Sequence, residues 1–215
     1  MQKDLGNYRK SYEKSALMER TISDNPLELF QKWFHETEAS EGVEEPNAMT
    51  VSTIGLDGFP KNRIVLLKKF TDEGFIFYTN YQSEKGRAIA KNPNICLSFF
   101  WPNMERQVII KGKAEKIAKN LSDGYFESRP EGSKLGAIAS KQSSVIASRE
   151  FLEDRLKELE EEYHGRPIER PDYWGGYIVK PESIEFWQGR PNRLHDRIRY
   201  VLQKNLNWVV ERLAP

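Results

Sequence analysis

Short segments that read as β-strands, each bounded by turn residues, recur over most of this chain and constrain its fold more than any other feature. The turns at Asp57-Gly58 and at Asp72-Glu73-Gly74 are tight enough to join antiparallel neighbours, so the first three segments are expected to form a meander. Many antiparallel strands beside few helices predict a mostly β chain with flanking helices (α+β), folded as a closed or split barrel and not as a βαβ fold. The predicted strands are Met49 to Leu56, Lys61 to Phe70, Phe75 to Thr79, Asn94 to Trp101, Arg106 to Ile117, Tyr173 to Val179, Ser183 to Gln188, Arg193 to Leu202 and Trp208 to Leu213.

Helices are predicted where capping residues precede apolar residues at helical spacing. Asn25, Pro26 and Glu28 are typical of the first positions of a helix, and aromatic residues follow them. The other predicted helices are Ser83 to Lys91, two short helices within residues 119–140 that separate at Arg129-Pro130, and a longer one that Ser148 caps. Residues 1–24 are polar and weakly periodic and are expected to be a flexible arm. No linker divides residues 25–215, so we expect one domain there.

The charge balance argues against several classes of protein. Lys and Arg number 33 and Asp and Glu number 32, which gives a net charge of +1 and speaks against a general nucleic-acid or membrane-surface binder. The charged N-terminus has no apolar region of the kind that secretion signals have, so a cytoplasmic protein is expected. The single cysteine, Cys96, rules out a disulfide within the chain, and three scattered histidines predict no metal site.

A cationic run follows Phe186-Trp187-Gln188-Gly189 near the end of the sequence. If this run is an extended strand, Arg193, His195 and Arg197 project from one face, because side chains alternate along a strand. Guanidinium groups give forked hydrogen bonds to phosphate or carboxylate, and an imidazole exchanges a proton near neutral pH. The run therefore predicts a wall suited to a small, planar, anionic ligand.

Other cations fall into two groups that could hold phosphates. The first group is Arg63 with Lys85, which stands at the start of a predicted helix, where backbone N–H groups favour an anion. The second group is Lys68 with Tyr125, Arg129 and Ser133. Arg63 and Lys68 differ by an odd number, so an unbroken strand would aim them at opposite faces and could serve two phosphates. Neither G-x-G-x-x-G after a strand nor G-x-x-x-x-G-K-[ST] is present, so side chains would have to hold the anions.

Blocks of residues along nearly the whole chain resemble the pyridoxamine/pyridoxine 5'-phosphate oxidase family. They run in family order and are Arg63 to Lys68, Phe77-Tyr78-Thr79-Asn80, Glu105-Arg106-Gln107-Val108, Tyr125-Phe126 with Ser128-Arg129-Pro130, Ser140 to Ser144, Phe186-Trp187-Gln188-Gly189, Arg193-Leu194-His195-Asp196-Arg197 and Arg212-Leu213-Ala214-Pro215. The resemblance implies an antiparallel FMN-binding split β-barrel that works as a homodimer with each flavin at the subunit interface.

The resemblance also implies roles for individual residues. Those implied to contact FMN are Arg63, Ile64, Val65, Leu66, Leu67, Lys68, Tyr78, Thr79, Lys85, Gln107, Gln142, Ser143, Trp187 and Arg197. Those implied to contact substrate are Lys68, Tyr125, Arg129 and Ser133 at its phosphate, Arg193, Leu194 and His195 at its ring, and Arg9, Lys10 and Tyr12 from an arm that folds over it. Arg193, His195 and Arg197 would be catalytic. Two departures stand out, because Glu84 replaces an arginine that many relatives carry and Lys10-Ser11 replaces a more usual Arg-Glu pair.

The implied reaction is an FMN-dependent oxidation of pyridoxamine 5'-phosphate or pyridoxine 5'-phosphate to pyridoxal 5'-phosphate, in which O2 is reduced to H2O2. Such an enzyme serves vitamin B6 salvage. Two alternatives remain open on the sequence, because a fold does not fix a reaction: a general flavin reductase on the same barrel, and a non-catalytic protein that binds FMN or pyridoxal phosphate. Arg129 and the Arg193-Leu194-His195 run favour the oxidase, since a reductase has no evident need for them.

Overall fold

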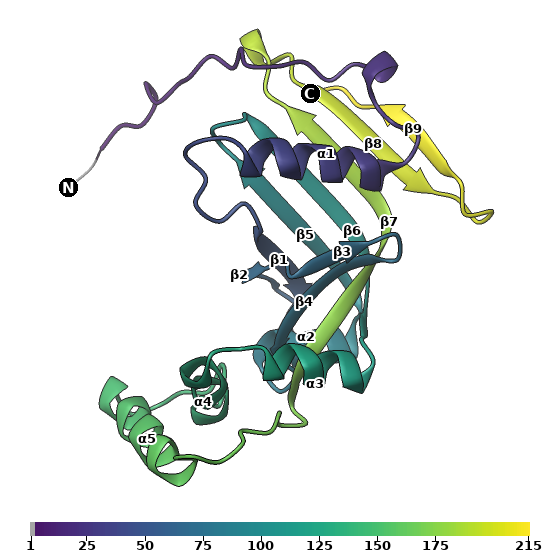
Figure 1. Ribbon diagram of the computed structural model, residues 1–215. Helices are drawn as coiled ribbons and strands as arrows, with labels where there is room; N and C mark the ends of the chain where they lie inside the picture. Colours follow the sequence, from purple (N-terminus) through teal and green to yellow (C-terminus); the bar gives the residue numbers. More distant parts are fainter. Residues whose placement is uncertain (1–2) are drawn as a thin grey trace. The chain divides into compact units, whose positions relative to one another are not determined.

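One β-sheet runs through the computed structural model, which describes residues 3–215 (Figure 1). Its nine strands within the described residues lie in the order β2-β1-β5-β6-β7-β4-β3, with β8 beside β7 and β9 beside β8. The strands are β1 (Ala48–Ile54), β2 (Pro60–Leu66), β3 (Lys69–Thr71), β4 (Gly74–Asn80), β5 (Asn94–Trp101), β6 (Arg106–Lys116), β7 (Trp174–Gln188), β8 (Asp196–Leu202) and β9 (Trp208–Arg212).

The chain divides into two compact units, and each draws on separate stretches of sequence. The first unit consists of Met1–Met49, Leu97–Lys111 and Pro181–Pro215, and the second consists of Thr50–Cys96 and Gly112–Lys180. An arm over residues 1–24 and one domain over residues 25–215 stay a prediction.

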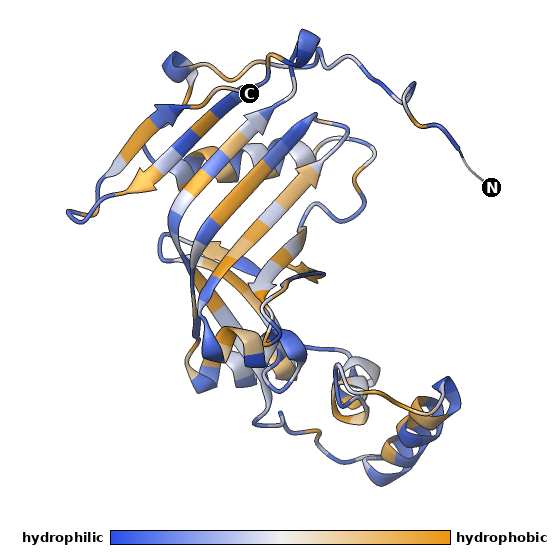
Figure 2. Ribbon diagram, turned by 180° about the vertical axis from the view of Figure 1, so that it is seen from behind, coloured by the Kyte–Doolittle hydropathy of each residue, from blue (hydrophilic) through white to orange (hydrophobic). Residues whose placement is uncertain are grey.

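The first unit is built around α1 (Pro26–Glu38), which lies against strands in Figure 1. The helix begins as predicted, because the Asn25 side chain accepts a hydrogen bond from the backbone N–H of Leu27. Its apolar face buries Phe30 against Phe99, with ring centroids 5.2 Å apart, and Trp33 against Phe186 at the same separation. The unit also holds two short 3₁₀ helices, η1 (Glu19–Thr21) and η2 (Pro191–Arg193). Hydrophobic and hydrophilic residues alternate along several strands in Figure 2, as expected for strands with one buried face.

The second unit carries the helices α2 (Glu84–Lys91), α3 (Lys119–Glu127), α4 (Glu131–Ala139) and α5 (Arg149–Glu162). The predicted Ser148 cap is confirmed, since its side chain accepts from the Phe151 N–H. Ser83, predicted as the first residue of its helix, is the N-cap of α2 and accepts from the Gly86 N–H. A side chain at position 86 would place its Cβ 2.2 Å from the Tyr81 carbonyl oxygen, so the first turn of α2 requires glycine there. The separation of α3 from α4 at Arg129-Pro130 is also confirmed.

The two pairings of the predicted meander are confirmed, but its continuous middle strand is wrong. Strand β2 pairs with β1 and β3 pairs with β4, but β4 pairs with β7, and β2 and β3 stand at opposite ends of the strand order. The predicted strand Lys61 to Phe70 accordingly breaks at residues 67–68 into β2 and β3. Local turn signals fix each hairpin, but they do not say whether two successive hairpins pair with each other.

A single strand, β7, replaces two predicted ones. Its ladder with β4 ends at Phe75↔Val179, and its ladder with β8 begins at Ser183↔Val201. Pro181 falls between these ladders, where its missing N–H removes no bond to β4 or β8, and this is why the strand continues through a proline.

No helix within residues 3–215 is long and apolar enough to cross a membrane. The same residues hold no group of three or more His, Cys, Asp or Glu side chains that could bind a metal ion. A cytoplasmic location stays a prediction.

Candidate active site

The second unit contains a cavity of about 500 Å³ that gathers most of the predicted phosphate ligands. Residues from β2, β4, α2, α3 and α4 line it, together with the start of β7. Cofactor and substrate residues that the sequence analysis kept in separate groups therefore meet in one cavity. The predicted residues that line it are Ile64, Val65, Leu66, Lys68, Tyr78, Thr79, Lys85, Tyr125, Arg129, Ser133 and Gln142.

Lys85 is a buried cation in this cavity, and it donates hydrogen bonds to neutral side chains. Its ammonium donates to the Thr79 hydroxyl at 3.0 Å and to the Gln142 side-chain oxygen at 2.9 Å, with the Ser83 hydroxyl at 3.4 Å. Burial, and then the like charge of Arg63, lower the pKa of Lys85 to about 8. A dianion beside this ammonium would stabilise its charged form, so the position is suited to a phosphate.

Arg129 is the second cation of the cavity, and one of its N–H groups has no partner. Its Nη1 is buried without a hydrogen bond, and its guanidinium lies 4.7 Å from the centroid of the Trp174 ring. Burial lowers the pKa of Arg129. A buried N–H group without an acceptor lowers the stability of the protein unless an anion or a water molecule accepts from it. The surroundings of Arg129 are therefore also suited to a phosphate or a carboxylate.

Aromatic rings also line this cavity. Tyr78 stacks on Tyr125 with ring centroids 3.8 Å apart, and Trp174 lies nearly parallel to both rings. Burial raises the pKa of Tyr78, so its hydroxyl stays protonated and can donate a hydrogen bond at neutral pH. The cavity thus combines flat aromatic surfaces with two cations, as a heteroaromatic phosphate ester requires.

Arg63 lies outside the lining of this cavity. Its guanidinium donates to the Thr53 hydroxyl at 2.7 Å and faces Glu84 at 3.8 Å, and Glu84 also pairs with Lys61 at 3.2 Å. Glu84 therefore neutralises cations that an arginine at this position would reinforce. The alternation argument for Arg63 and Lys68 does not apply, because β2 ends at Leu66 and Lys68 lies in the break before β3.

Two further predicted FMN residues take other positions in the second unit. Leu67 is buried at the break between β2 and β3. Ser143 lines a neighbouring cavity of about 350 Å³ beside Gln142, with its backbone in the left-handed region at φ 73°.

The first unit brings together three rings from distant parts of the chain. His195 lies 4.7 Å from Trp187 between ring centroids, and Tyr12 makes edge contacts with both rings at 5.8 Å and 5.7 Å. The backbone N–H of Arg190 donates to Nδ1 of His195 at 3.1 Å. In the neutral imidazole the proton is therefore on Nε2, which is free to donate to a ligand.

The predicted wall of Arg193, His195 and Arg197 is wrong in its geometry. Strand β8 begins at Asp196, and Arg193 lies in η2 with its backbone in the left-handed region at φ 62°. The turn after Gly189 replaces the strand, so alternation does not relate these side chains. Arg197 lies in β8, where it donates to Glu185 at 2.8 Å and to the carbonyl of Ala214.

The remaining predicted residues of the first unit are spread out. Leu194 is exposed beside Arg193, and Gln107 is half-buried in β6. Arg9 is exposed and donates to the carbonyl of Gly6, whereas Lys10 pairs with Glu105 at 3.1 Å.

Sequence reasoning missed three residues that the structure places at these sites. Trp174 and Asn80 line the cavity, and Glu105 contacts the arm. Trp174 could have been found from the sequence. It directly precedes two glycines at the start of a strand, and glycines in a strand often mark a site where a ligand or another backbone segment comes close. Glu105 had no local signal, because its partners lie about ninety residues away in the sequence.

Comparisons with known proteins agree on one family. Residues 36–163 match the family model described as pyridoxamine 5'-phosphate oxidase. Residues 174–215 match the model described as the pyridoxine 5'-phosphate oxidase C-terminal dimerisation region. Together the two matches cover most of the chain.

Curated relatives carry the same name over the full length. The chain is 71% identical to the pyridoxine/pyridoxamine 5'-phosphate oxidase of Flavobacterium psychrophilum over 99% of this chain and 100% of that protein. It is 47% identical to the protein of that name from Trichormus variabilis over 100% of both.

Solved structures support the predicted fold class. PhzG from Burkholderia lata, solved in complex with tetrahydrophenazine-1-carboxylic acid, has a TM-score of 0.85 at 28% identity and covers 93% of this chain and 98% of its own. A pyridoxamine 5'-phosphate oxidase-related, FMN-binding protein from Nostoc punctiforme has a TM-score of 0.72 at 15% identity and covers 90% of this chain and 100% of its own, which bears on the fold alone. The mostly β split barrel with flanking helices is thereby confirmed. The chain belongs to the pyridoxine/pyridoxamine 5'-phosphate oxidase family.

Proposed function

We propose that this protein binds FMN and oxidises pyridoxamine 5'-phosphate or pyridoxine 5'-phosphate to pyridoxal 5'-phosphate, with the cavity of the second unit holding phosphate groups. The reaction is supported by the family, because relatives that are 47–71% identical over the whole chain are named as this oxidase. The observation that carries the site is the pair Lys85 and Arg129, two partly or fully buried cations that face one cavity without a carboxylate partner.

The residues present fit FMN. A phosphate monoester carries nearly two negative charges at neutral pH and needs several donors. Lys85 and Thr79 offer such donors at the first turn of α2, whose N–H groups favour an anion, and Ser143 adds a hydroxyl in the neighbouring cavity. Gln142 orders Lys85 by accepting from it. When bound, FMN supplies the two-electron chemistry, accepting a hydride equivalent from C4' of the substrate and passing the electrons to O2.

The substrate phosphate would be held by Arg129, with Tyr125, Ser133 and Lys68 around it. Arg129 is suited to this role because its unpartnered Nη1 would gain a charged hydrogen bond. Anchoring the phosphate restricts how the rest of the molecule can lie, so binding energy far from C4' is used to orient it.

The ring end of the substrate would meet His195 and Arg193, with Arg197 steadying the flavin and Tyr12 covering the site from the arm. His195 is prepared for this by Arg190, whose N–H leaves Nε2 as the nitrogen that donates to the substrate. Trp187, whose ring centroid lies 4.7 Å from that of His195, would restrict how the imidazole can turn.

We also propose a homodimer with FMN at the subunit interface. Support comes from the match of residues 174–215 to a dimerisation region, since that region contains Trp187, Arg193, His195 and Arg197. In such a dimer the cavity of the second unit would come from one subunit, and the rings of Tyr12, Trp187 and His195 would come from the other.

An oxygen-uptake assay tests the proposal against the two alternatives left open by the sequence. Purified protein loaded with FMN should consume O2 and form H2O2 when either substrate is added. A protein that binds pyridoxal phosphate or FMN without forming peroxide would be the carrier, and one that oxidises NADH or NADPH in place of these substrates would be the reductase. Replacing Arg129 with Met should weaken the use of substrate while FMN stays bound, which ties the activity to this cavity.

A further inference from the structure

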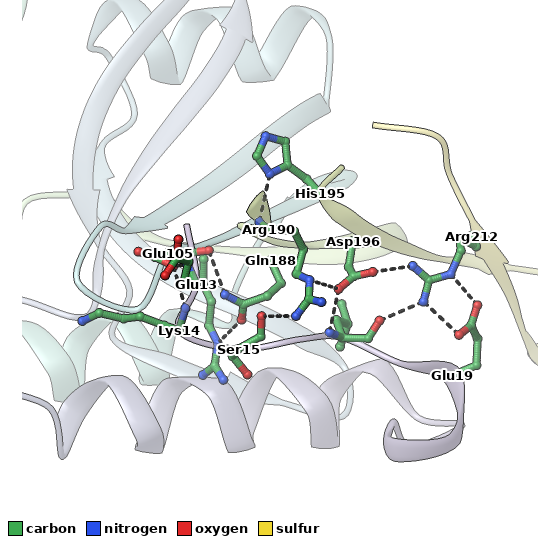
Figure 3. A network of polar contacts seen from close by, with 12 residues as sticks. Glu13, Lys14, Ser15, Glu19, Glu105, Gln188, Arg190, His195, Asp196 and Arg212 are labelled. Carbon is green, nitrogen blue, oxygen red and sulfur yellow. Dashed lines mark hydrogen bonds and ion pairs between the residues drawn. The ribbon is translucent and has the colours of Figure 1, made fainter. Parts of the chain in front are cut away.

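Glu105 is a buried carboxylate whose partners all come from the N-terminal arm, and no step of the proposed reaction uses it. Its side chain is 2% exposed. One oxygen accepts hydrogen bonds from the backbone N–H groups of Glu13 at 2.8 Å and Lys14 at 3.0 Å (Figure 3). The other oxygen faces the Lys10 ammonium at 3.1 Å. Burial alone would raise the pKa of Glu105, but these three donors hold it below its ordinary value. The carboxylate is therefore charged at neutral pH, and both of its oxygens have partners.

The backbone of Glu105 is fixed from the opposite side. Its φ of 54° lies in the left-handed region, a conformation that a non-glycine residue keeps only when its surroundings hold it. Its carbonyl accepts from the N–H of Gly189 at 2.7 Å and from the side chain of Gln188 at 3.2 Å. Glu105 thus connects the end of β7 to the arm within the first unit.

The segment held by Glu105 is the one that carries Tyr12. Tyr12 lies in the sequence between Lys10 and Glu13, two of the residues that the carboxylate contacts, and its ring meets Trp187 and His195. Space at this point is tight, because a Cβ on Gly189 would come within 2.7 Å of Cγ of Tyr12. The position of Tyr12 against the two rings therefore depends on where Glu105 holds the backbone.

We propose that Glu105 is a positioning residue: its carboxylate holds residues 10–14 so that Tyr12 covers Trp187 and His195. The inference rests on the proposed function, since it is the substrate site that the arm would cover. The arm beyond residue 14 has its own anchors. The Arg190 side chain donates to the Ser15 carbonyl, and Asp196 accepts from the Leu17 N–H (Figure 3). Loss of the Glu105 charge should accordingly free residues 10–14 and leave residues 15–20 in place.

Limited trypsin digestion of the FMN-loaded protein tests this without reference to catalysis. In E105Q the rate of cleavage after Lys10 and Lys14 should rise about tenfold or more, because the ion pair with Lys10 is lost and the two backbone N–H groups keep only a neutral acceptor. Cleavage after Arg20, which lies beyond the Asp196 anchor, should not change. Glu13→Gln is the matched control. Within residues 3–215 its exposed carboxylate accepts only from the Ser11 hydroxyl, so this variant should digest like the wild type.

A second variant keeps the Glu105 charge and moves the arm. Gly189→Ala should displace Tyr12 and raise cleavage after Lys10 and Lys14 in the same way. Both variants should raise KM for pyridoxamine 5'-phosphate about tenfold while kcat changes less than about twofold, since the arm contacts the substrate alike before and during reaction.

The proposal would be overturned if E105Q were cleaved after Lys10 and Lys14 at the wild-type rate. It would also be overturned if the cleavage rate rose equally after Arg20 and in α5, because that would indicate a general loss of stability. A wild-type protein without oxidase activity would refute the proposed function instead, and the digestion would still decide the role of Glu105.

Discussion

The affinity for FMN should fall as the pH rises above about 8, because Lys85 loses its proton there. Burial and the like charge of Arg63 bring the pKa of Lys85 to about 8 in the ligand-free protein. The FMN phosphate, with a second pKa of about 6, is a dianion throughout this range. Once bound beside Lys85 it would raise the lysine pKa, so binding at higher pH must take up a proton.

The size of the effect follows from the fraction of Lys85 that is charged. That fraction is about nine-tenths at about pH 7 and about one-tenth at about pH 9, so Kd for FMN should rise about tenfold between them. The affinity for FMN should not depend on Lys85 protonation well below the pKa of the lysine in the ligand-free protein, and it should fall as the pH rises above that pKa.

Titration of FMN by fluorescence quenching at a series of pH values measures this directly. Lys85→Met should bind FMN weakly with no pH slope, whereas Lys91→Met, on the exposed last turn of the same helix, should keep the wild-type slope. Riboflavin, which lacks the phosphate, should show no slope with the wild type. An equal Kd for FMN at both ends of the range, or a slope that Lys91→Met removes as well, would refute the reasoning.

Three substitutions test other parts of the account. Arg129→Met should raise KM for pyridoxamine 5'-phosphate about ten- to a hundredfold, because a charged hydrogen bond to phosphate is lost, and equal weakening of FMN binding would contradict its assignment to the substrate. Arg193→Leu should lower kcat/KM by a factor on the order of ten to a thousand with FMN still bound, and unchanged turnover would remove Arg193 from the site. Trp33→Ala should lower the free energy of unfolding in urea by about 3–5 kcal/mol, because it empties the contact with Phe186 and Arg106, and a loss below about 1 kcal/mol would show that this core collapses around the gap.

Helix starts could be predicted from the sequence because their causes are local. Asn25 and Ser148 each cap a helix at the predicted place, through a bond to a backbone N–H two or three residues later. Strand pairing could not be predicted in the same way. The partner of β4 is β7, about a hundred residues away, and nothing in either segment alone specifies that choice.

The site residues show the same difference between features with local causes and features that depend on distant parts of the chain. The sequence analysis singled out Lys85 and Arg129, and both side chains line one cavity, while their roles stay a prediction. The wall built on alternation from Arg193 to Arg197 was wrong, because a short 3₁₀ turn with left-handed residues replaces the start of the strand. Glu105 was missed, since its role arises only when the arm and the loop after β5 come together.

The most direct test of the central claim is peroxide formation by the purified protein after FMN loading. With pyridoxamine 5'-phosphate and then pyridoxine 5'-phosphate as sole substrates, the account predicts one H2O2 and one pyridoxal 5'-phosphate for each O2 consumed. Binding of both phosphate esters without oxygen uptake would contradict it.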